Sequence, residues 1–220
     1  MNKFLSAPPL RKSGFSLLEL LCAIAVLAIL VSILIPTLGS MKKRSNQIVC
    51  SNNLRSLGTA IHLYANEHSG RLPGPLYAGQ YTYFPALDKY QLMAHIKEYI
   101  EINLIKGDRD RIKTMVCPAY ESQIDSEGAR HYILNVGRVP LTNGTKDQVF
   151  GYPGSDSTGR EVNLPKRLNQ IIEPNKSWAI KDLDQVDYPG YSSDTPEQPV
   201  HGESRNVLYF DGHIEAVPII

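Results

Sequence analysis

The chain has 220 residues, and its 23 basic side chains against 22 acidic ones leave a formal net charge of +1. Because nucleic-acid-binding domains usually carry a clear excess of positive charge, this balance disfavours nucleic acid as a partner. With 42% hydrophobic residues and 3 cysteines, the composition is neither that of a disordered chain nor that of a disulfide-rich scaffold. The length is typical of one or two domains.

The most apolar stretch lies near the N-terminus, where residues 15–35 read FSLLELLCAIAVLAILVSILI. At about 1.5 Å per residue, a helix of this length crosses a hydrocarbon core of about 30 Å. Residues 1–14 contain three basic residues and no acidic one, so the positive-inside rule keeps this segment in the cytoplasm. We therefore expect a transmembrane helix over 15–36, with the rest of the chain exported. The run is too long for a secretory signal peptide and no A-x-A site follows it.

Glu19 interrupts this apolar run, and an acidic side chain at the centre of a bilayer costs about 2.5–3.5 kcal/mol. It ends the segment GFSLLE of residues 14–19, which resembles the class III signal of type IV pilins and type II secretion pseudopilins. The resemblance implies cleavage after Gly14 by a prepilin peptidase and N-methylation of Phe15. The freed amine and the Glu19 carboxylate can then pair, within one helix or between subunits. The resemblance implies the intersubunit pair, in which Glu19 aligns each incoming subunit.

Pro36 closes the apolar run and resembles the helix-kinking proline of the same family, because proline removes a backbone donor and crowds the preceding turn. A proline at the end of a helix is the alternative. Residues 37–68 remain compatible with helix, and polar residues separate the positions of one apolar stripe. The stripe, with spacings of 4, 3, 4 and 3, consists of Cys50, Leu54, Leu57, Ile61 and Tyr64. We expect this amphipathic continuation to hold the exported domain.

The exported head, residues 69–220, is predicted to be an antiparallel sheet packed on the long helix. Asp211-Gly212 between two alternating runs predicts a hairpin. Two stretches rich in Gly, Pro, Asn and Ser, 140–166 and 184–205, are expected as surface excursions. The fold class is therefore α+β and pilin-like. The segments expected as strands are 115–117, 131–139, 177–183 and 206–217.

Two cysteines lie outside the membrane run, in a compartment expected to be oxidising. A disulfide between Cys50 and Cys117 would join the helix to the head and contribute about 2–4 kcal/mol. Two buried free thiols are the alternative. Cys22, within the membrane run, is interpreted as a packing residue.

His201, nine further residues and then Asp211-Gly212 resemble the processing-associated His-x9-Asp-Gly motif, found at the C-terminus of a pilin-like subgroup in diderm bacteria. Residues 50–75 resemble the same subgroup. His201 and Asp211 could meet across the strand to hydrogen-bond or to hold a metal. The other interpretation, a loop-closing contact plus a turn, is the one we favour.

An acidic run that includes Asp182, Asp184 and Asp187 carries oxygen ligands of the kind that Ca²⁺ prefers. Major pseudopilins of type II secretion bind calcium in a C-terminal loop. The run lacks the sixth-position Gly and twelfth-position Glu of an EF-hand, so a solvated loop is favoured over a calcium site. No cofactor is otherwise expected.

No nucleophile stands at a recognisable spacing from a base, and no phosphate-binding loop is present, so we expect no enzyme. The sequence predicts a prepilin-like structural subunit of a type II secretion pseudopilus, held in the inner membrane with a periplasmic head. Its expected partners are prepilin peptidase, other pilin-like subunits and the assembly platform. One alternative is a type IV pilus pilin for adhesion, motility or DNA uptake. The other is a membrane-anchored periplasmic binding domain that never polymerises.

Overall fold

The computed structural model divides the chain into two compact units, Met1–Lys42 and Lys43–Ile220. The expected processing site, Gly14 and Phe15, lies outside the residues that the structure describes. The described residues are 16–83, 88–106, 110–121, 123, 129–154, 163–191 and 194–219.

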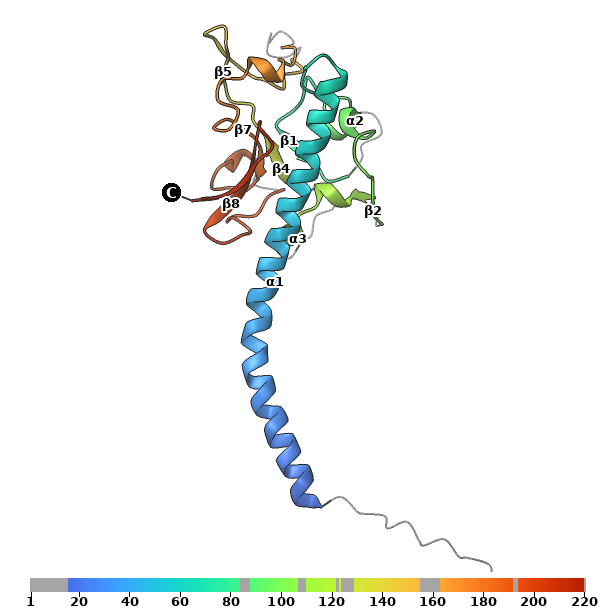
Figure 1. Cartoon of the computed structure of the whole chain (residues 1–220), viewed down its shortest axis with the longest axis vertical. Coiled ribbons are helices and arrows are strands. Elements are labelled where there is room, and N and C mark those ends of the chain that lie inside the picture. Colours follow the sequence, from blue (N-terminus) through green and yellow to red (C-terminus); the bar gives the residue numbers. More distant parts are fainter. Residues whose placement is uncertain are drawn as a thin grey trace, which may run out of the picture. The chain divides into compact units, whose positions relative to one another are not determined.

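One helix of 51 residues, α1 (Leu17–Glu67), begins in the first unit and ends in the second (Figure 1). Among the described residues it is the one helix long and apolar enough to cross a membrane, with a mean hydropathy of 2.9 over 18 residues. None of that window is buried inside the structure, and lipid is the solvent that suits such a surface. The helix continues through position 36, so Pro36 does not end it, and its role as a kink stays a prediction.

The second unit is built on a five-stranded sheet in which every neighbouring pair is antiparallel, in the order β1-β4-β7-β8-β9. This confirms the predicted α+β class, a long helix followed by an antiparallel sheet. The five strands are β1 (Gly79–Tyr81), β4 (Arg130–Leu134), β7 (Trp178–Asp182), β8 (Ser204–Tyr209) and β9 (Ile214–Pro218).

Shorter elements surround this sheet. Two further antiparallel pairs are β2 (Leu104–Ile105) with β3 (Arg111–Ile112), and β5 (Val139–Pro140) with β6 (Lys146–Asp147). The short helices are α2 (Leu92–Ile96) and α3 (Pro118–Glu121), with 3₁₀ turns at Lys113–Met115, Leu168–Gln170 and Pro189–Tyr191.

The apolar stripe of α1 forms one side of the core of the head. Cys50, Leu54 and Leu57 are fully buried, and Ile61 is nearly so. A Cβ on Gly58 would lie 2.9 Å from Leu208 Cδ1, so the helix backbone approaches strand β8 closely at this glycine. The predicted stripe is therefore confirmed as the face that holds the head.

The β8–β9 hairpin forms where the sequence predicts it. Gly212 has φ +92°, a conformation that glycine adopts without steric cost, and its N–H donates to the carbonyl of Tyr209 at 3.0 Å. Leu208 pairs with Ile214 at the last register position before the turn.

Two predictions of local structure are wrong. Residues 115–117 form no strand: Met115 ends a 3₁₀ turn and Pro118 opens α3, because an apolar run of three residues is too short to specify a strand. Residues 140–166 are not purely a surface excursion. They contain β6, and Phe150 is buried with its ring centroid 5.5 Å from that of Phe210.

Replacing Gly151 with alanine should destabilise the head far more than replacing Gly144. Both have positive φ, of +70° and +81°, which costs a residue with a Cβ about 1–2 kcal/mol. A Cβ on Gly151 would in addition lie 2.3 Å from the carbonyl oxygen of Asn163, whereas one on Gly144 has nothing within 4 Å. We expect a loss of about 3 kcal/mol at Gly151. Denaturant unfolding followed by fluorescence of Trp178 measures both; equal losses would contradict the close contact.

Candidate functional site

The N-terminus of α1 is closed by a variant of the capping box that includes Glu19, in which Ser16 Oγ accepts the N–H of Leu18 rather than that of Glu19. The Ser16 N–H donates to Glu19 Oε2 at 3.0 Å, and the Leu18 N–H donates to Ser16 Oγ at 3.3 Å. These reciprocal bonds satisfy amide groups that the first turn of a helix leaves free, and a carboxylate there also faces the positive end of the helix dipole. Glu19 therefore has a local structural role that the sequence analysis did not assign, although the Ser-x-x-Glu pattern of residues 16–19 signals it.

The same geometry bears on the expected processing site. Phe15 immediately precedes Ser16, so cleavage after Gly14 would free an amine one residue away from the amide that Glu19 already accepts. The pairing of amine and carboxylate stays a prediction.

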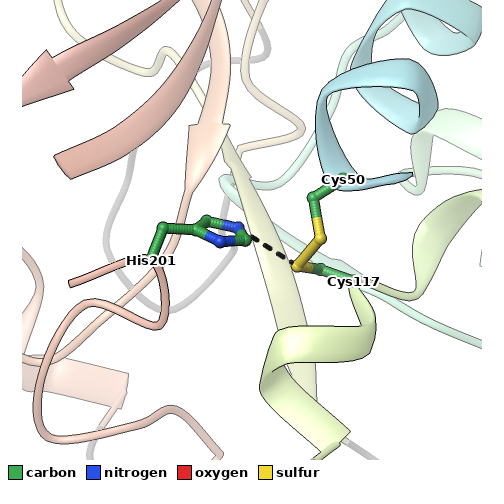
Figure 2. A group of neighbouring side chains, drawn as sticks. All are labelled: Cys50, Cys117 and His201. Carbon is green, nitrogen blue, oxygen red and sulfur yellow. Dashed lines mark hydrogen bonds between the residues drawn. A yellow bond between two sulfur atoms is a disulfide. The ribbon is translucent and has the colours of Figure 1, made fainter. Parts of the chain in front are cut away.

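In the head, a disulfide joins Cys50 of α1 to Cys117 in the segment before α3, the pairing considered from the sequence. Both cysteines are fully buried. His201, from the loop before β8, lies against this disulfide, with Nε2 3.4 Å from Cys117 Sγ (Figure 2). The same nitrogen lies 3.5 Å from Oδ2 of Asp182, at the end of β7. The helix, two loops and the sheet thus each contribute one side chain to a buried cluster.

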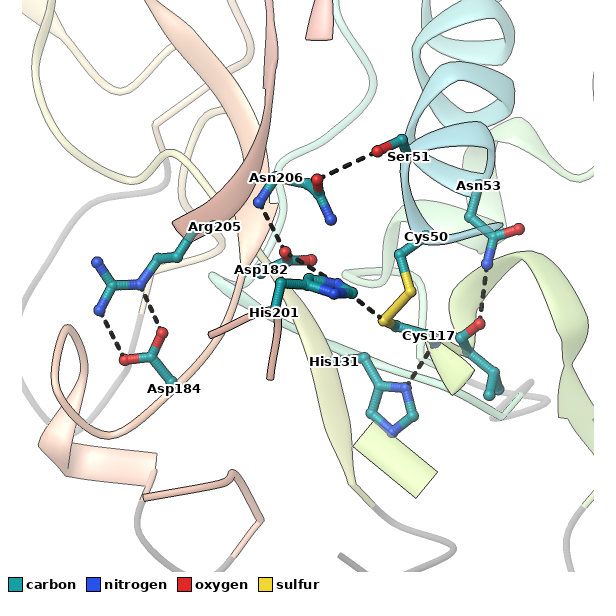
Figure 3. Close-up of polar contacts among 11 residues, drawn as sticks. Cys50, Ser51, Asn53, Cys117, His131, Asp182, Asp184, His201, Arg205 and Asn206 are labelled. Atoms are coloured by element: carbon teal, nitrogen blue, oxygen red, sulfur yellow. Dashed lines mark hydrogen bonds and ion pairs between the residues drawn. A yellow bond between two sulfur atoms is a disulfide. The ribbon is translucent and has the colours of Figure 1, made fainter. Parts of the chain in front are cut away.

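A second layer of hydrogen bonds holds this cluster (Figure 3). The Asn206 N–H donates to Asp182 Oδ2 at 2.7 Å, and Ser51 Oγ donates to Asn206 Oδ1 at 3.1 Å. The Cys117 N–H donates to Nδ1 of the buried His131 at 2.9 Å. Ser51 lies outside the apolar stripe of α1, yet its side chain connects the helix to strand β8.

Asn53 is the other polar residue of α1 that turns toward the head. Its Nδ2 donates to the carbonyl of Val116 at 2.8 Å, next to the disulfide. The solvent-exposed face of α1 is consequently narrower than the pattern of apolar residues predicts, because short polar side chains beside the apolar stripe form hydrogen bonds with the head.

Burial shifts the pKa values of the ionisable side chains in the cluster and so sets their charges. Desolvation lowers the pKa of His201 to about 4, so its imidazole is neutral at pH 7. Desolvation raises the pKa of Asp182 to about 7; hydrogen bonds from Asn206 oppose this shift and the nearby Asp184 adds to it. The His201–Asp182 contact at neutral pH is therefore not an ion pair of two full charges.

Replacing Asp182 with asparagine should change how the stability of the head depends on pH. The folded carboxyl keeps its proton up to about pH 7, whereas the unfolded one loses it near pH 4. The contribution of Asp182 is therefore fully present below about pH 4 and is lost as the pH rises to about 7, by about 1.4 kcal/mol per pH unit.

The measurement is the free energy of unfolding of the parent minus that of Asp182→Asn, taken from about pH 4 to about pH 8. The difference should fall up to about pH 7 and then stay flat. Groups common to both chains, such as His131, largely cancel. A difference that does not vary with pH would contradict a carboxyl with a raised pKa.

The two ends of the His-x9-Asp-Gly motif do not meet. His201 contacts the disulfide and Asp182, whereas Asp211 Oδ1 accepts the N–H of His213 at 3.1 Å and lies 2.6 Å from its Nδ1. The idea of a direct contact between His201 and Asp211 is thus wrong. Asp211 and Gly212 shape the hairpin, while His201 closes its loop onto the disulfide, so the two parts of the motif have separate structural roles.

The side chains of the acidic run do not gather around one point in the structure. Asp184 accepts two bonds from Arg205, at 2.5 and 2.8 Å, and Asp187 forms an ion pair with Lys181. Asp182 faces His201 instead. Among the described residues, the group with metal-ligand spacing is Cys50, Cys117 and His201, and the acidic run forms no such group of its own.

The sequence analysis did not predict that Asp182, His131 and Asn206 lie near the disulfide. Each is a polar residue within or at the end of an apolar strand segment, and such placement is the one available signal that its side chain is buried and partnered. Which partner it has depends on strand order, which the local sequence does not encode.

Comparison with known proteins bears on the N-terminal segment. The family model for the prokaryotic N-terminal methylation motif matches residues 9–35, a segment that contains Gly14, Phe15 and Glu19. Searches of curated proteins and of solved structures gave no match to the chain. The chain thus carries a prepilin-type N-terminal signal, the start of type IV pilin-like proteins, ahead of a head with pilin-like α+β architecture.

Proposed function

We propose that this chain is the precursor of a structural subunit of a type II secretion pseudopilus. Prepilin peptidase cleaves it after Gly14, and the new N-terminal Phe15 is methylated. α1 anchors the subunit in the inner membrane, with residues 1–14 in the cytoplasm and the head in the periplasm. Assembly joins it to other pilin-like subunits through the assembly platform of the secretion system.

The observation that carries the proposal is a methylation motif at residues 9–35 that leads directly into a helix able to cross a membrane. The capping bond to the Ser16 N–H uses the Glu19 carboxylate but supplies no cation for it, and an unpaired carboxylate in a membrane helix is costly. Cleavage would supply the missing cation close to Glu19, and pairing of the two charges offsets the cost of burying either. A neighbour's amine can take the same position and set the register between subunits.

The apolar half of α1 supports assembly as well as anchoring. Its large side chains are more than half exposed at Leu17, Leu27 and Ile33, for example. A subunit that leaves the bilayer must cover this surface again, because it is unfavourable in water. Packing α1 helices of several copies against one another provides that cover and forms the core of a filament.

For the head we propose a mechanical role rather than a catalytic one. The disulfide and the hydrogen bonds of Ser51 and Asn53 tie it to α1, so that force on the helix is transmitted to the sheet. Removal of residues 1–14 would leave 20 basic and 22 acidic groups, a balance that supports protein partners over nucleic acid.

The test is the intact mass and N-terminal sequence of the protein extracted from membranes. We expect a chain that begins at Phe15 and carries one methyl group on its α-amine. A chain that begins at Met1, or at a residue beyond Pro36, would overturn the proposal, because the helix would then be a plain anchor or signal.

A second experiment separates a pseudopilus from a pilus. The prepilin-type signal is common to both, so the assignment to secretion is tested by deleting the gene. Loss of secreted proteins without loss of surface filaments supports the pseudopilus. Loss of filaments beyond the outer membrane, with secretion intact, identifies a type IV pilus pilin instead.

A further inference from the structure

We propose that the dithiol form of the head binds Zn²⁺ through Cys50, Cys117 and His201, with Asp182 as the fourth ligand, and that this site and the disulfide are alternative states of the same two cysteines. The proposal concerns the head alone and does not depend on filament assembly.

The first support is the spacing of the donor atoms. The two sulfurs and a ring nitrogen of His201 all lie within 4.8 Å of one another. With Zn–S near 2.3 Å and Zn–N near 2.0–2.1 Å, tetrahedral coordination separates sulfur from nitrogen by about 3.5 Å and nitrogen from a carboxylate oxygen by about 3.4 Å. His201 Nε2 lies 3.4 Å from Cys117 Sγ and 3.5 Å from Asp182 Oδ2. The nitrogen therefore already stands at tetrahedral separations from one sulfur and from one oxygen of the Asp182 carboxyl group, and rotation of that group would present its other oxygen.

The second support is an unpartnered acceptor at this point. Asp182 is 3% exposed, and its Oδ1 has no hydrogen-bond partner among the described residues. A buried carboxyl oxygen left without a partner costs about 1–3 kcal/mol whether or not it carries the proton, so proteins rarely retain one. The Asn206 N–H fixes the other oxygen, Oδ2, at 2.7 Å, which holds the carboxyl group in place. A cation between the sulfurs, the imidazole and this carboxyl group would satisfy it.

The third support is the layer that surrounds the donors. His131 accepts the N–H of Cys117, and the Asn206 N–H donates to Asp182 Oδ2, so that both the thiol segment and the carboxyl group are oriented by a second residue. Outer partners of this kind fix ligands in structural zinc sites. The His201 side chain is 2% exposed, so that its ring is held against the sulfurs and the carboxyl group rather than in solvent.

The two states interconvert by balanced chemistry. The chain is synthesised with both thiols reduced; Zn²⁺ binding releases their two protons and, where the Asp182 carboxyl group still holds its proton, that proton as well. Oxidation by an exchange partner that carries a disulfide removes two electrons from the two sulfurs, forms the Cys50–Cys117 bond and releases the ion, while the partner takes up two protons from water and becomes a dithiol. A dithiol partner reverses the reaction. Two thiolates with an imidazole favour zinc over the hard cations Ca²⁺ and Mg²⁺.

The experiment uses the full chain in detergent, with Cys22→Ser to remove the remaining cysteine. The protein is reduced with a phosphine without oxygen, incubated with ZnCl₂ or CoCl₂, and desalted. We expect one ion per reduced chain, none on the oxidised chain, and the thiolate-to-cobalt charge-transfer band of a tetrahedral site. Zn²⁺ should also raise the melting temperature of the reduced chain and leave that of the oxidised chain unchanged.

His201→Ala tests the ligand set, with His213→Ala as the matched control on the exposed hairpin. Loss of an outer partner alone weakens metal sites about 10–100-fold, so loss of the His201 ligand should weaken binding at least as much. His213→Ala should bind as the parent does. Equal affinities in the two variants, or no retained ion in the reduced parent, would overturn the site.

If the reduced head unfolds, the rate of its reoxidation is measured instead. Zn²⁺ should slow formation of the Cys50–Cys117 disulfide in the parent and in His213→Ala, but not in His201→Ala. Equal rates with and without Zn²⁺ in the parent would also overturn the proposal.

Discussion

Replacing Glu19 with alanine should leave the chain in the membrane and cleaved, yet exclude it from filaments. Insertion should not suffer, because the substitution removes a side chain that costs about 2.5–3.5 kcal/mol at the bilayer centre. Assembly should suffer because the amine of Phe15 loses its partner. We expect the subunit content of sheared filament fractions to fall at least about tenfold, the equivalent of 1.4 kcal/mol of lost pairing. Immunoblots of membrane and filament fractions measure this.

Glu19→Gln is the matched control that separates charge from helix capping. A glutamine oxygen can still accept the Ser16 N–H at the N3 position of the capping box, but it carries no charge to pair with an amine. We expect this variant to fail in assembly like Glu19→Ala. Assembly at the parental level would show that Glu19 acts as a helix cap and would contradict the pairing.

Removing the Cys50–Cys117 disulfide should cost the head a large part of its stability. The bond closes a sequence separation of 67 residues, for which the loss of unfolded-state entropy contributes about 4 kcal/mol. Domains of this kind have about 5–15 kcal/mol in total. The double variant Cys50→Ala/Cys117→Ala should therefore unfold at much lower denaturant concentration, as followed by the fluorescence of Trp178.

Cys22→Ala is the control for this pair, since Cys22 is the free cysteine of the described residues and lies in the apolar half of α1. It should unfold like the parent. A reductant should shift the parent toward the double variant and leave the double variant unchanged. If the parent and the double variant unfold at the same denaturant concentration, the disulfide does not stabilise the head.

The predictions that succeeded rest on signals within one element. The stripe from Cys50 to Ile61 follows the period of a helix, and Asp211-Gly212 stands between two alternating runs. Apolar runs of about three residues are too short to show the period of a helix or the alternation of a strand. Residues 115–117 were therefore assigned wrongly, and β1, with only three residues between turns, was not recognised at all.

The polar cluster around the disulfide could not be predicted from the sequence. Cys117, Asp182 and His201 lie far apart along the chain, and nothing in their neighbourhoods states that they converge on Cys50. The motif suggested Asp211 as the partner of His201, but the partner is Asp182, because β7 and β8 are adjacent in the sheet and the loop before β8 folds over the end of β7.

The sequence by itself determined the prepilin-type signal, the membrane-crossing helix and its amphipathic continuation, because a linear motif and a helical period are readable in one segment. Only the tertiary structure decided that Ser51 and Asn53 bond to the head, that the members of the acidic run have separate partners, and that His201 and Asp182 flank the disulfide. These contacts depend on strand order and on which loops cross the buried face of α1, and burial then sets the pKa values of the cluster.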